Sequence, residues 1–243
     1  MFDDNPDVPS TSRLQSAAVA STIAAALLHG TLAEAQQQLT HEKVTSKRGM
    51  VVSVSGPASD VGAAVLKNGG NAVDAAIATA LALAVTYPAA GNIGGGGFMV
   101  VWPGDGRPMA FDFREKAPGA ATQDMFVKPE GRTAHRRVGV PGTVRGLALA
   151  HEKLGTKPWK DLVSPAVKLA AEGFPLDQAN ATQITELLKD SDKPEHAELH
   201  RVFDKPGGGD WKKDDRLIQP DLAKSLERIR DRGIDGFYKG ETA

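Results

Sequence analysis

The sequence predicts an α+β fold built from helices and a few short strands. The segment Ala72–Thr86 is apolar on nearly every face, which is typical of a buried helix. Two runs of β-forming residues, Phe98–Trp102 and Met109–Phe113, flank a Pro-Gly-Asp-Gly turn and indicate a β-hairpin. Near the C-terminal end, Pro220–Arg232 has the apolar spacing of an amphipathic helix.

Composition and charge narrow the possible functions without selecting one. The chain has 243 residues, enough for one large domain or two small ones. Apolar residues make up 41% of the chain but aromatic residues only 5%, so close packing of alanine- and glycine-rich helices is expected. A formal net charge of −1 gives no overall field that would favour nucleic acid or an anionic membrane. The absence of cysteine excludes disulfides, thiolate metal sites and a cysteine nucleophile.

Residues 1–38 differ from the rest of the chain and resemble a secretory signal peptide. Arg13 precedes a short apolar run, Ala17–Leu28, and a small-x-small cleavage site ends at Ala35. The acidic stretch before Arg13 is unusual for a signal, and a disordered tail with an alanine-rich helix is the alternative. The apolar run is too short for a membrane span. A functional signal predicts a periplasmic or secreted protein, and otherwise a cytoplasmic one is expected.

The globular part, residues 44–243, is predicted to begin with a strand and two helices. Met50–Ser55 is short and rich in valine, as expected of a buried strand. The helix Ala58–Lys67 ends at Asn68–Gly70, and Asn71 can cap the following helix. Later patterns predict a strand at Arg136–Val140, helices at Thr143–Leu154, Trp159–Val163, Ser164–Glu172 and Asp177–Lys189, and a polar excursion over residues 190–215.

The sequence lacks the common phosphate-binding motifs, a complete metal-ligand set and the serine-hydrolase motif. The run Gly94–Gly97 matches neither G-x-G-x-x-G nor a Walker loop, so it does not predict a phosphate site. His196 and His200 have the i,i+4 spacing of metal ligands, but no third ligand is evident, so we interpret them as solvated side chains. No G-x-S-x-G elbow is present for a serine hydrolase.

One residue stands out as a candidate for binding. The guanidinium of Arg114 can hold a carboxylate through two parallel hydrogen bonds, or it can form an ion pair with Glu115 or Asp112. Spacing alone favours the ion pair. Three further polar residues are explained by helix capping or ion pairing: Ser59, Asp74 and Arg145.

A series of motifs, taken in order, resembles the beginning of the large subunit of γ-glutamyltranspeptidases. The motifs are Ser55–Ser59 with Gly62, Leu66–Ala76, Asn92–Phe98, Asp112–Glu115, Val140–Leu147, Gln219–Ala223 and Gly236–Gly240. The similarity spans about Val44 to Ala243, and motifs of this length in one order are highly specific.

The resemblance implies a fold and a reaction. It implies an αββα sandwich of the N-terminal nucleophile hydrolase type, whose precursor cleaves itself before a threonine that then acts as nucleophile and base. The γ-glutamyl group of glutathione or a related compound passes through an acyl-enzyme to water or to an amino-acid acceptor. In this family the arginine of the Asp-Phe-Arg-Glu motif, here Arg114, holds the α-carboxylate of the substrate. No cofactor and no metal are implied.

The resemblance also implies what this sequence lacks. The threonine and the oxyanion-hole glycines of the family lie beyond the position that matches Ala243, so Gly94–Gly97 are expected only to pack beneath the pocket. We therefore assign no catalytic residue and expect an incomplete sandwich, inert alone, that needs a C-terminal small-subunit portion as partner. Exposed sheet edges and apolar faces should result. A related cephalosporin-type acylase, or a non-catalytic fragment that docks a separate C-terminal half, is the alternative.

Overall fold

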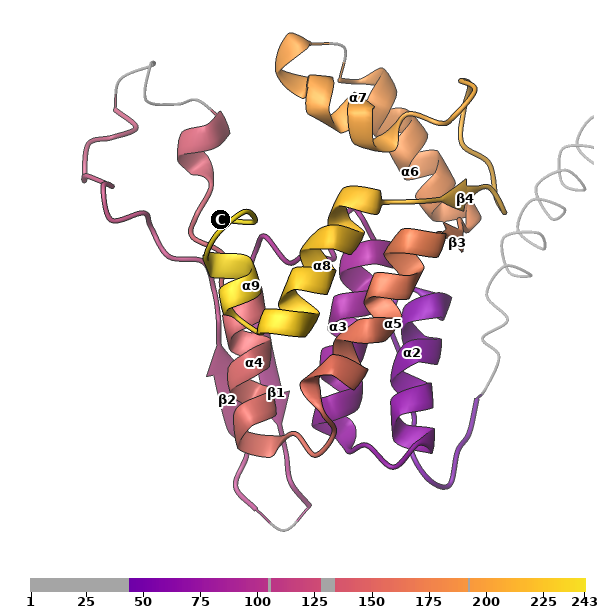
Figure 1. The fold of residues 1–243 in the computed structure, drawn as a ribbon, viewed down its shortest axis with the longest axis vertical. Coiled ribbons are helices and arrows are strands. Elements are labelled where there is room, and N and C mark those ends of the chain that lie inside the picture. Colours follow the sequence, from indigo (N-terminus) through magenta and orange to yellow (C-terminus); the bar gives the residue numbers. More distant parts are fainter. Residues whose placement is uncertain (1–43, 105, 128–133, 192) are drawn as a thin grey trace, which may run out of the picture. The chain divides into compact units, whose positions relative to one another are not determined.

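The computed structural model describes residues 44–104, 106–127, 134–191 and 193–243. The chain divides into two units, 1–47 and 48–243, and every element named below belongs to the second unit. The signal-peptide prediction for residues 1–38 lies outside the described residues. The elements (Figure 1) are α2 (Gly56–Lys67), α3 (Ala72–Thr86), β1 (Phe98–Val101), β2 (Met109–Asp112), η2 (Ala134–Arg137), α4 (Thr143–Leu154), α5 (Trp159–Glu172), β3 (Phe174–Pro175), α6 (Gln178–Lys189), η3 (Pro194–His196), α7 (Ala197–Phe203), β4 (Arg216–Leu217), α8 (Pro220–Arg232) and α9 (Asp235–Tyr238).

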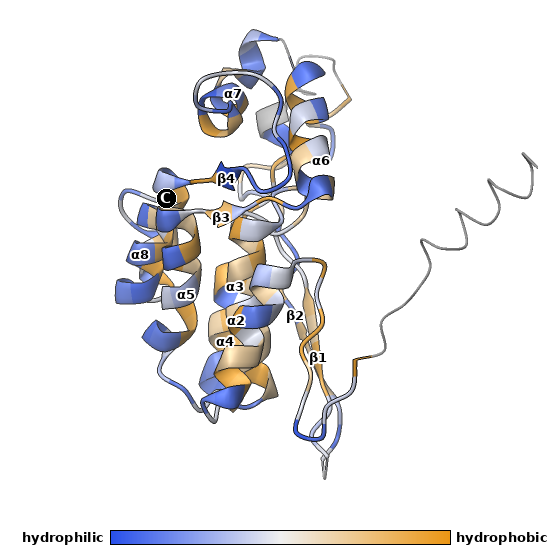
Figure 2. Ribbon diagram, turned by 90° about the vertical axis from the view of Figure 1, so that its right-hand side faces the viewer, coloured by the Kyte–Doolittle hydropathy of each residue, from blue (hydrophilic) through white to orange (hydrophobic). Residues whose placement is uncertain are grey.

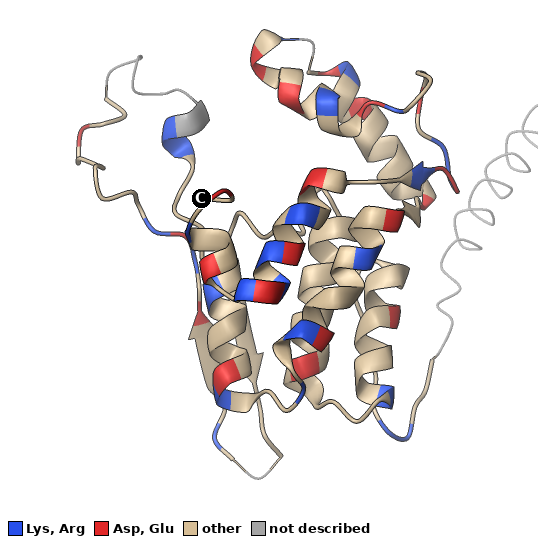
Figure 3. Ribbon diagram, viewed as in Figure 1, with Lys and Arg blue, Asp and Glu red and all other residues tan. Residues whose placement is uncertain are grey.

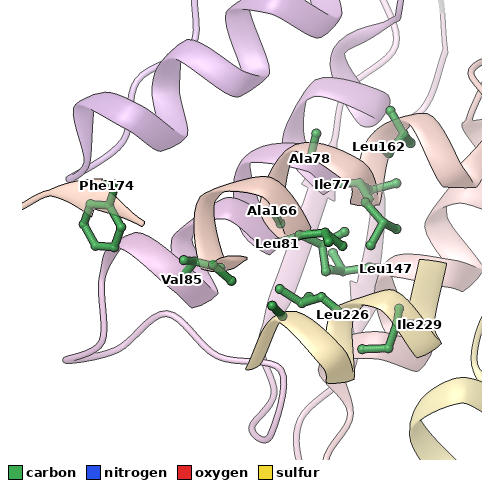
Figure 4. Close-up of a cluster of buried hydrophobic side chains, with 14 of the residues drawn as sticks. Ile77, Ala78, Leu81, Val85, Leu147, Leu162, Ala166, Phe174, Leu226 and Ile229 are labelled. Carbon is green, nitrogen blue, oxygen red and sulfur yellow. The ribbon is translucent and has the colours of Figure 1, made fainter. Parts of the chain in front are cut away.

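The helix α3 lies at the centre of the core, as its apolar sequence predicts. It packs against α2, α4 and α5, and α8 packs against α5. Ile77, Leu81 and Val85 of α3 are fully buried in a cluster with side chains from α4, α5 and α8 (Figure 4). Each such side chain contributes about 1.5–3 kcal/mol when it leaves water. The helix therefore fixes the positions of its neighbours.

The helices α5 and α8 bury one apolar face each. The sequence predicted two helical pieces at Trp159–Val163 and Ser164–Glu172, which is wrong, because α5 runs unbroken with Pro165 inside it. The two pieces share one buried face, and its burial outweighs the hydrogen bond that proline cannot donate. In α8 acidic and basic residues alternate along the exposed side (Figure 3), which confirms the predicted amphipathic helix.

The predicted hairpin is confirmed, and its two faces differ. β1 and β2 pair antiparallel with Met99 opposite Phe111. Phe111 is buried toward the helices, which lie on one side of the hairpin (Figure 2). On the opposite face Phe98, Val100 and Trp102 are 63%, 75% and 77% exposed. A sheet face this apolar is typical of a surface that another layer covers. A second pair, β3 with β4, has only two residues per strand.

Two predicted strands are wrong for the described residues. Met50–Ser55 is extended, and its residues alternate between inward and exposed positions, but it has no strand partner in the part of the chain that the structure describes. The hydroxyls of Ser53 and Ser59 are instead hydrogen-bonded to each other at 2.8 Å. Ser59 therefore fixes this extended segment and does not serve as a helix cap. In the segment Arg136–Val140, the first two residues belong to the 3₁₀ helix η2. Among the described residues of this segment, only Val140 forms a β-bridge, with Lys116. A strand needs a neighbour to complete its hydrogen bonds, and local sequence does not supply one.

The polar segment 190–215 is more ordered than the sequence predicted. It contains η3 and α7, and Trp211 is buried with its Nε1 donating to the carbonyl of Phe203 at 2.8 Å. The glycines Gly207, Gly208 and Gly209 all have positive φ, which only glycine adopts readily. One buried aromatic ring thus anchors a loop whose composition alone indicated no core.

Candidate functional site

Arg114 lies just beyond the end of β2, where its own neighbours hold it. Asp112 Oδ1 accepts from the backbone N–H of Arg114 at 3.0 Å, and Arg114 Nε donates to Glu115 Oε2 at 3.2 Å. The guanidinium carbon lies 5.9 Å from the centre of the Phe98 ring. The ion pair expected from spacing therefore exists, but it uses only Nε. The two terminal nitrogens have no partner among the described residues, which leaves them free to hold a carboxylate.

Glu115 stays ionised beside this arginine. The pKa of its carboxyl is lowered by hydrogen bonds from its own backbone N–H and from the Arg114 side chain, with a further bond from the backbone of Gly96. An ionised Glu115 orients the guanidinium by accepting from Nε. The carboxylate thus engages Nε and leaves the two terminal nitrogens to other partners.

Close packing of glycines fixes the backbone of Arg114. A Cβ on Gly96 would lie 2.6 Å from the carbonyl oxygen of Phe113 and 2.9 Å from the Cα of Arg114. A Cβ on Gly142 would overlap the same Phe113 carbonyl. By contrast, a Cβ on Gly94 would meet no atom within 4 Å. Within Gly94–Gly97, the predicted close packing is therefore found at Gly96, whereas Gly94 has free space around its Cα.

The beginning of α4 is bonded directly to the glycine run. Gly95 O accepts from the backbone N–H groups of Gly142 and Thr143 at 2.7 and 3.1 Å. Thr143 Oγ1 donates to Asn92 Oδ1 at 2.7 Å. The two backbone bonds satisfy N–H groups at the N-terminus of α4, where a helix has no internal acceptors for them. They also join α4, the glycine run and the Arg114 segment into one wall.

A cavity of about 510 Å³ opens beside that wall. Arg114, Lys116 and Arg145 line it together with one carboxylate, Asp112, and the ring of Tyr238. The lining is therefore mainly positive. Anions, carboxylates among them, are the ligands that such a lining favours.

The ion pair that the sequence suggested for Arg145 is absent from the described residues. The guanidinium carbon instead lies 5.2 Å from the centre of the Tyr238 ring. Tyr238 comes from α9, and burial raises the pKa of its hydroxyl. Sequence reasoning missed Arg145 because this partner is 93 residues away along the chain.

Asp74 is confirmed as a capping residue. Its carboxylate accepts from the backbone N–H of Asn71 at 3.0 Å, while Asn71 Oδ1 accepts from the N–H of Asp74, which completes a capping box. Thr156 adds a backbone bond at 3.0 Å and a hydroxyl bond at 2.6 Å. Asp74 is fully buried, so this group is structural.

The two histidines at metal-ligand spacing do not form a site. His200 Nδ1 lies 2.9 Å from Asp204 Oδ1, and its Nε2 lies 3.2 Å from the carbonyl of Ser191. The interpretation of His200 as a solvated side chain is therefore wrong. Within the described ranges, no three histidines or carboxylates gather as a metal site would require. In the same part of the chain, no helix is long and apolar enough to cross a membrane.

Comparison with solved structures defines the class of fold. The crystal structure of Helicobacter pylori γ-glutamyltranspeptidase matches with a TM-score of 0.76 and 41% identity, over 83% of this chain and 59% of that chain. A cephalosporin acylase from Bacillus halodurans matches with a TM-score of 0.68 and 26% identity, over 83% of this chain and 40% of that one. The fold is that of the N-terminal nucleophile hydrolases, as the sequence predicted, and the described residues place helices on one face of the hairpin.

Sequence comparison narrows that class to one family. The glutathione hydrolase proenzymes of Pseudomonas sp. (strain A14) and Escherichia coli (strain K12) are 48% and 47% identical, each over 82% of this chain. The chain spans only 36% and 35% of their lengths. Residues 58–243 match the family model described as Gamma-glutamyltranspeptidase. The chain belongs to the γ-glutamyltranspeptidase family.

Proposed function

We propose that this chain forms the donor-binding wall of a γ-glutamyltransferase or glutathione hydrolase, in which Arg114 binds the α-carboxylate of the γ-glutamyl group. The observation that carries the proposal is the geometry of Arg114: Glu115 occupies Nε, and both terminal nitrogens remain available beside a cavity. A guanidinium in this state offers the paired donors that a carboxylate requires. Membership of the family agrees with this role.

The chemistry that we propose divides the work between this chain and a C-terminal portion. A threonine hydroxyl of that portion attacks the γ-carbonyl of glutathione, the amine of cysteinylglycine leaves, and water or an amino acid then takes the γ-glutamyl group. Arg114 holds the far end of the γ-glutamyl group, so that the carbonyl faces the threonine. We assign no catalytic residue, cofactor or metal to the chain itself.

The exposed face of the hairpin supports the proposed partner. Phe98, Val100 and Trp102 form an apolar stripe on β1 and just beyond it. Val52 and Val54 are 81% and 66% exposed on an extended segment that has no strand partner among the described residues. Strands from a C-terminal portion would cover the stripe and complete the hydrogen bonds of that segment. This assembly produces the second half of the αββα sandwich.

The remaining proposals concern the beginning of the chain and its processing. We propose that residues 1–38 act as a secretory signal ahead of a globular part at 44–243, and that the protein is periplasmic or secreted. The relatives from Pseudomonas and Escherichia coli are named proenzymes, which supports synthesis as a zymogen that self-cleaves.

Complementation tests the proposed activity. The chain is produced together with the segment that follows the matched part of the Pseudomonas sp. (strain A14) relative, and hydrolysis of glutathione is measured. In the active complex Arg114→Ala should raise KM by the equivalent of roughly 2–4 kcal/mol, since one bidentate charged contact is lost. Arg107→Ala, an exposed arginine beyond the cavity lining, is the matched control and should leave KM unchanged.

Two outcomes would contradict the proposal. An active complex whose KM is insensitive to Arg114→Ala would remove Arg114 from the binding site. A complex that ignores γ-glutamyl compounds and releases the side chain of a cephalosporin would favour the related acylase, to which the Bacillus halodurans structure is similar.

A further inference from the structure

Arg145 is a second guanidinium on the wall of the Arg114 cavity. It lies in the first turn of α4, one helical turn beyond Gly142, and a Cβ on Gly142 would lie 3.1 Å from the carbonyl oxygen of Arg114. The two arginines therefore come from adjacent pieces of backbone, although 31 positions separate them in the sequence. Both line the same cavity.

The surroundings hold Arg145 without neutralising it. The hydroxyl of Tyr238 donates to the carbonyl of Pro141 at 2.7 Å and accepts from the backbone N–H of Arg145 at 3.4 Å. These bonds fix the ring, over which the guanidinium lies at 5.2 Å. A ring attracts a cation but takes none of its N–H donors in the plane. The guanidinium has no hydrogen bond or ion pair with any residue that the structure describes, so its donors remain available.

The cavity has positive groups that neither its own acids nor a first ligand carboxylate engages. Arg114, Lys116 and Arg145 are positive, Asp112 is the acidic residue among the described lining, and Glu115, beside the lining, pairs with Arg114. Asp112 Oδ1 already accepts from the backbone of Arg114. After a ligand carboxylate binds Arg114, Arg145 still presents a full positive charge. The lining thus fits a ligand with two anionic ends.

We propose that Arg145 binds a second carboxylate of the donor, the one at the C-terminal end of a γ-glutamyl peptide. This inference rests on the proposed function, since it assumes that the γ-glutamyl end occupies Arg114. A tripeptide spans about 10 Å when extended, which suits a cavity of 510 Å³. The cavity then selects γ-glutamyl peptides with a free C-terminal carboxylate over amides and esters that lack one.

A pair of ligands that differ only at the distal end tests this selection. Glutathione and its glycine monoethyl ester share the γ-glutamyl group, but only glutathione has the C-terminal carboxylate. Their dissociation constants for the 243-residue chain are measured by NMR titration at low ionic strength, where charged contacts are least screened. We expect glutathione to bind about 10-fold more tightly than the ester, because a charge-assisted contact is added.

Substitutions then assign that preference to a residue. Arg145→Gln should bring the ratio of the two dissociation constants close to one, with binding of the ester unchanged. Arg145→Lys should restore part of the ratio, because the charge returns without the planar pair of donors. Lys153→Gln removes a charge from the exposed last turn of the same helix and should leave the ratio intact. Thermal unfolding of each variant verifies that it folds.

The substitution Arg114→Gln separates the inference from the function on which it rests. This substitution should weaken the binding of both ligands and preserve the ratio of their dissociation constants. If Arg114→Gln weakens both ligands but Arg145→Gln leaves the ratio unchanged, the inference is overturned and the proposed function stands. If Arg114→Gln changes the binding of neither ligand, the proposed function fails and the inference fails with it. If neither ligand binds the chain alone, the ratio is taken from the KM values of the active complex with the C-terminal portion, with the same expected results.

Discussion

Asp74 and Arg114 are both charged residues in motifs that match the family, yet they differ in burial and in how many of their hydrogen-bonding groups have partners. Asp74 is 0% exposed and accepts hydrogen bonds from Asn71, Thr156 and Lys157, which use its lone pairs. Arg114 is exposed, and one of the five N–H donors of its guanidinium bonds a residue that the structure describes. A charge whose bonds are complete holds the fold together. A charge with donors left over beside a cavity is available to a ligand.

The largest effect should come from breaking the complete cluster. Asp74→Ala removes the charged acceptor of four part-buried hydrogen bonds, from Asn71, Thr156 and Lys157, so we expect the free energy of unfolding to fall by about 3–5 kcal/mol. Chemical denaturation measures this loss. Asp60→Ala, on the exposed side of α2, is the control and should change stability by less than about 0.5 kcal/mol. Equal losses in the two variants would show that the Asp74 bonds add nothing.

The pH dependence of that loss follows from the pKa of Asp74. Burial raises this pKa, but bonds from the Thr156 side chain and from the backbone of Asn71, Thr156 and Lys157 outweigh burial and lower it. The stabilisation is therefore fully present above the unfolded pKa, about 3.9, and is lost as the pH falls through the lower folded value. The wild type should approach Asp74→Ala in stability only in acid.

Sequence reasoning succeeds where the interacting residues are neighbours in the chain. The capping box joins Asn71 to Asp74, and the hairpin joins two strands across one turn, so both could be predicted locally. The strand prediction at Met50–Ser55 failed because a short, valine-rich run does not reveal whether a partner strand exists.

The candidate site divides in the same way. Spacing correctly indicated that Glu115 pairs with Arg114, and only the family resemblance suggested that the remaining donors serve a substrate. Arg145 was assigned to an ion pair because its real partner, Tyr238, is remote in the sequence. The cavity is lined by the segment at the end of β2, by α4 and by α9, and no local pattern encodes that these three segments meet.

An intermediate effect should come from two glycines of the same run. A Cβ on Gly96 meets the backbone of Phe113 and Arg114 below 3.0 Å, whereas Gly94 faces open space. Gly96→Ala should therefore cost about 1–3 kcal/mol of stability and weaken binding of glutathione, because the Arg114 backbone has to move. Gly94→Ala should be close to neutral in both measurements. Similar behaviour of the two variants would mean that the packing does not position Arg114.

The smallest effect should come from Glu115, the exposed counterpart of Asp74. Its pKa is also lowered, by hydrogen bonds from its own backbone N–H and from Arg114, so its contribution has the same sign. That contribution is present above the unfolded pKa, about 4.3, and is lost as the pH falls through the lower folded value. Solvent screens an exposed pair, and the change in stability for Glu115→Gln should be far smaller than that for Asp74→Ala.

Binding should separate these two carboxylates more clearly than stability does. Glu115→Gln frees the guanidinium of Arg114 to rotate, since a neutral amide holds Nε less strongly than a carboxylate does. NMR titration with glutathione at pH 7 should show weaker binding for Glu115→Gln, although the variant should lose little stability relative to the wild type. A variant that binds glutathione as the wild type does would mean that Glu115 only satisfies a surface charge, and that the glycine packing alone aims Arg114 at the cavity.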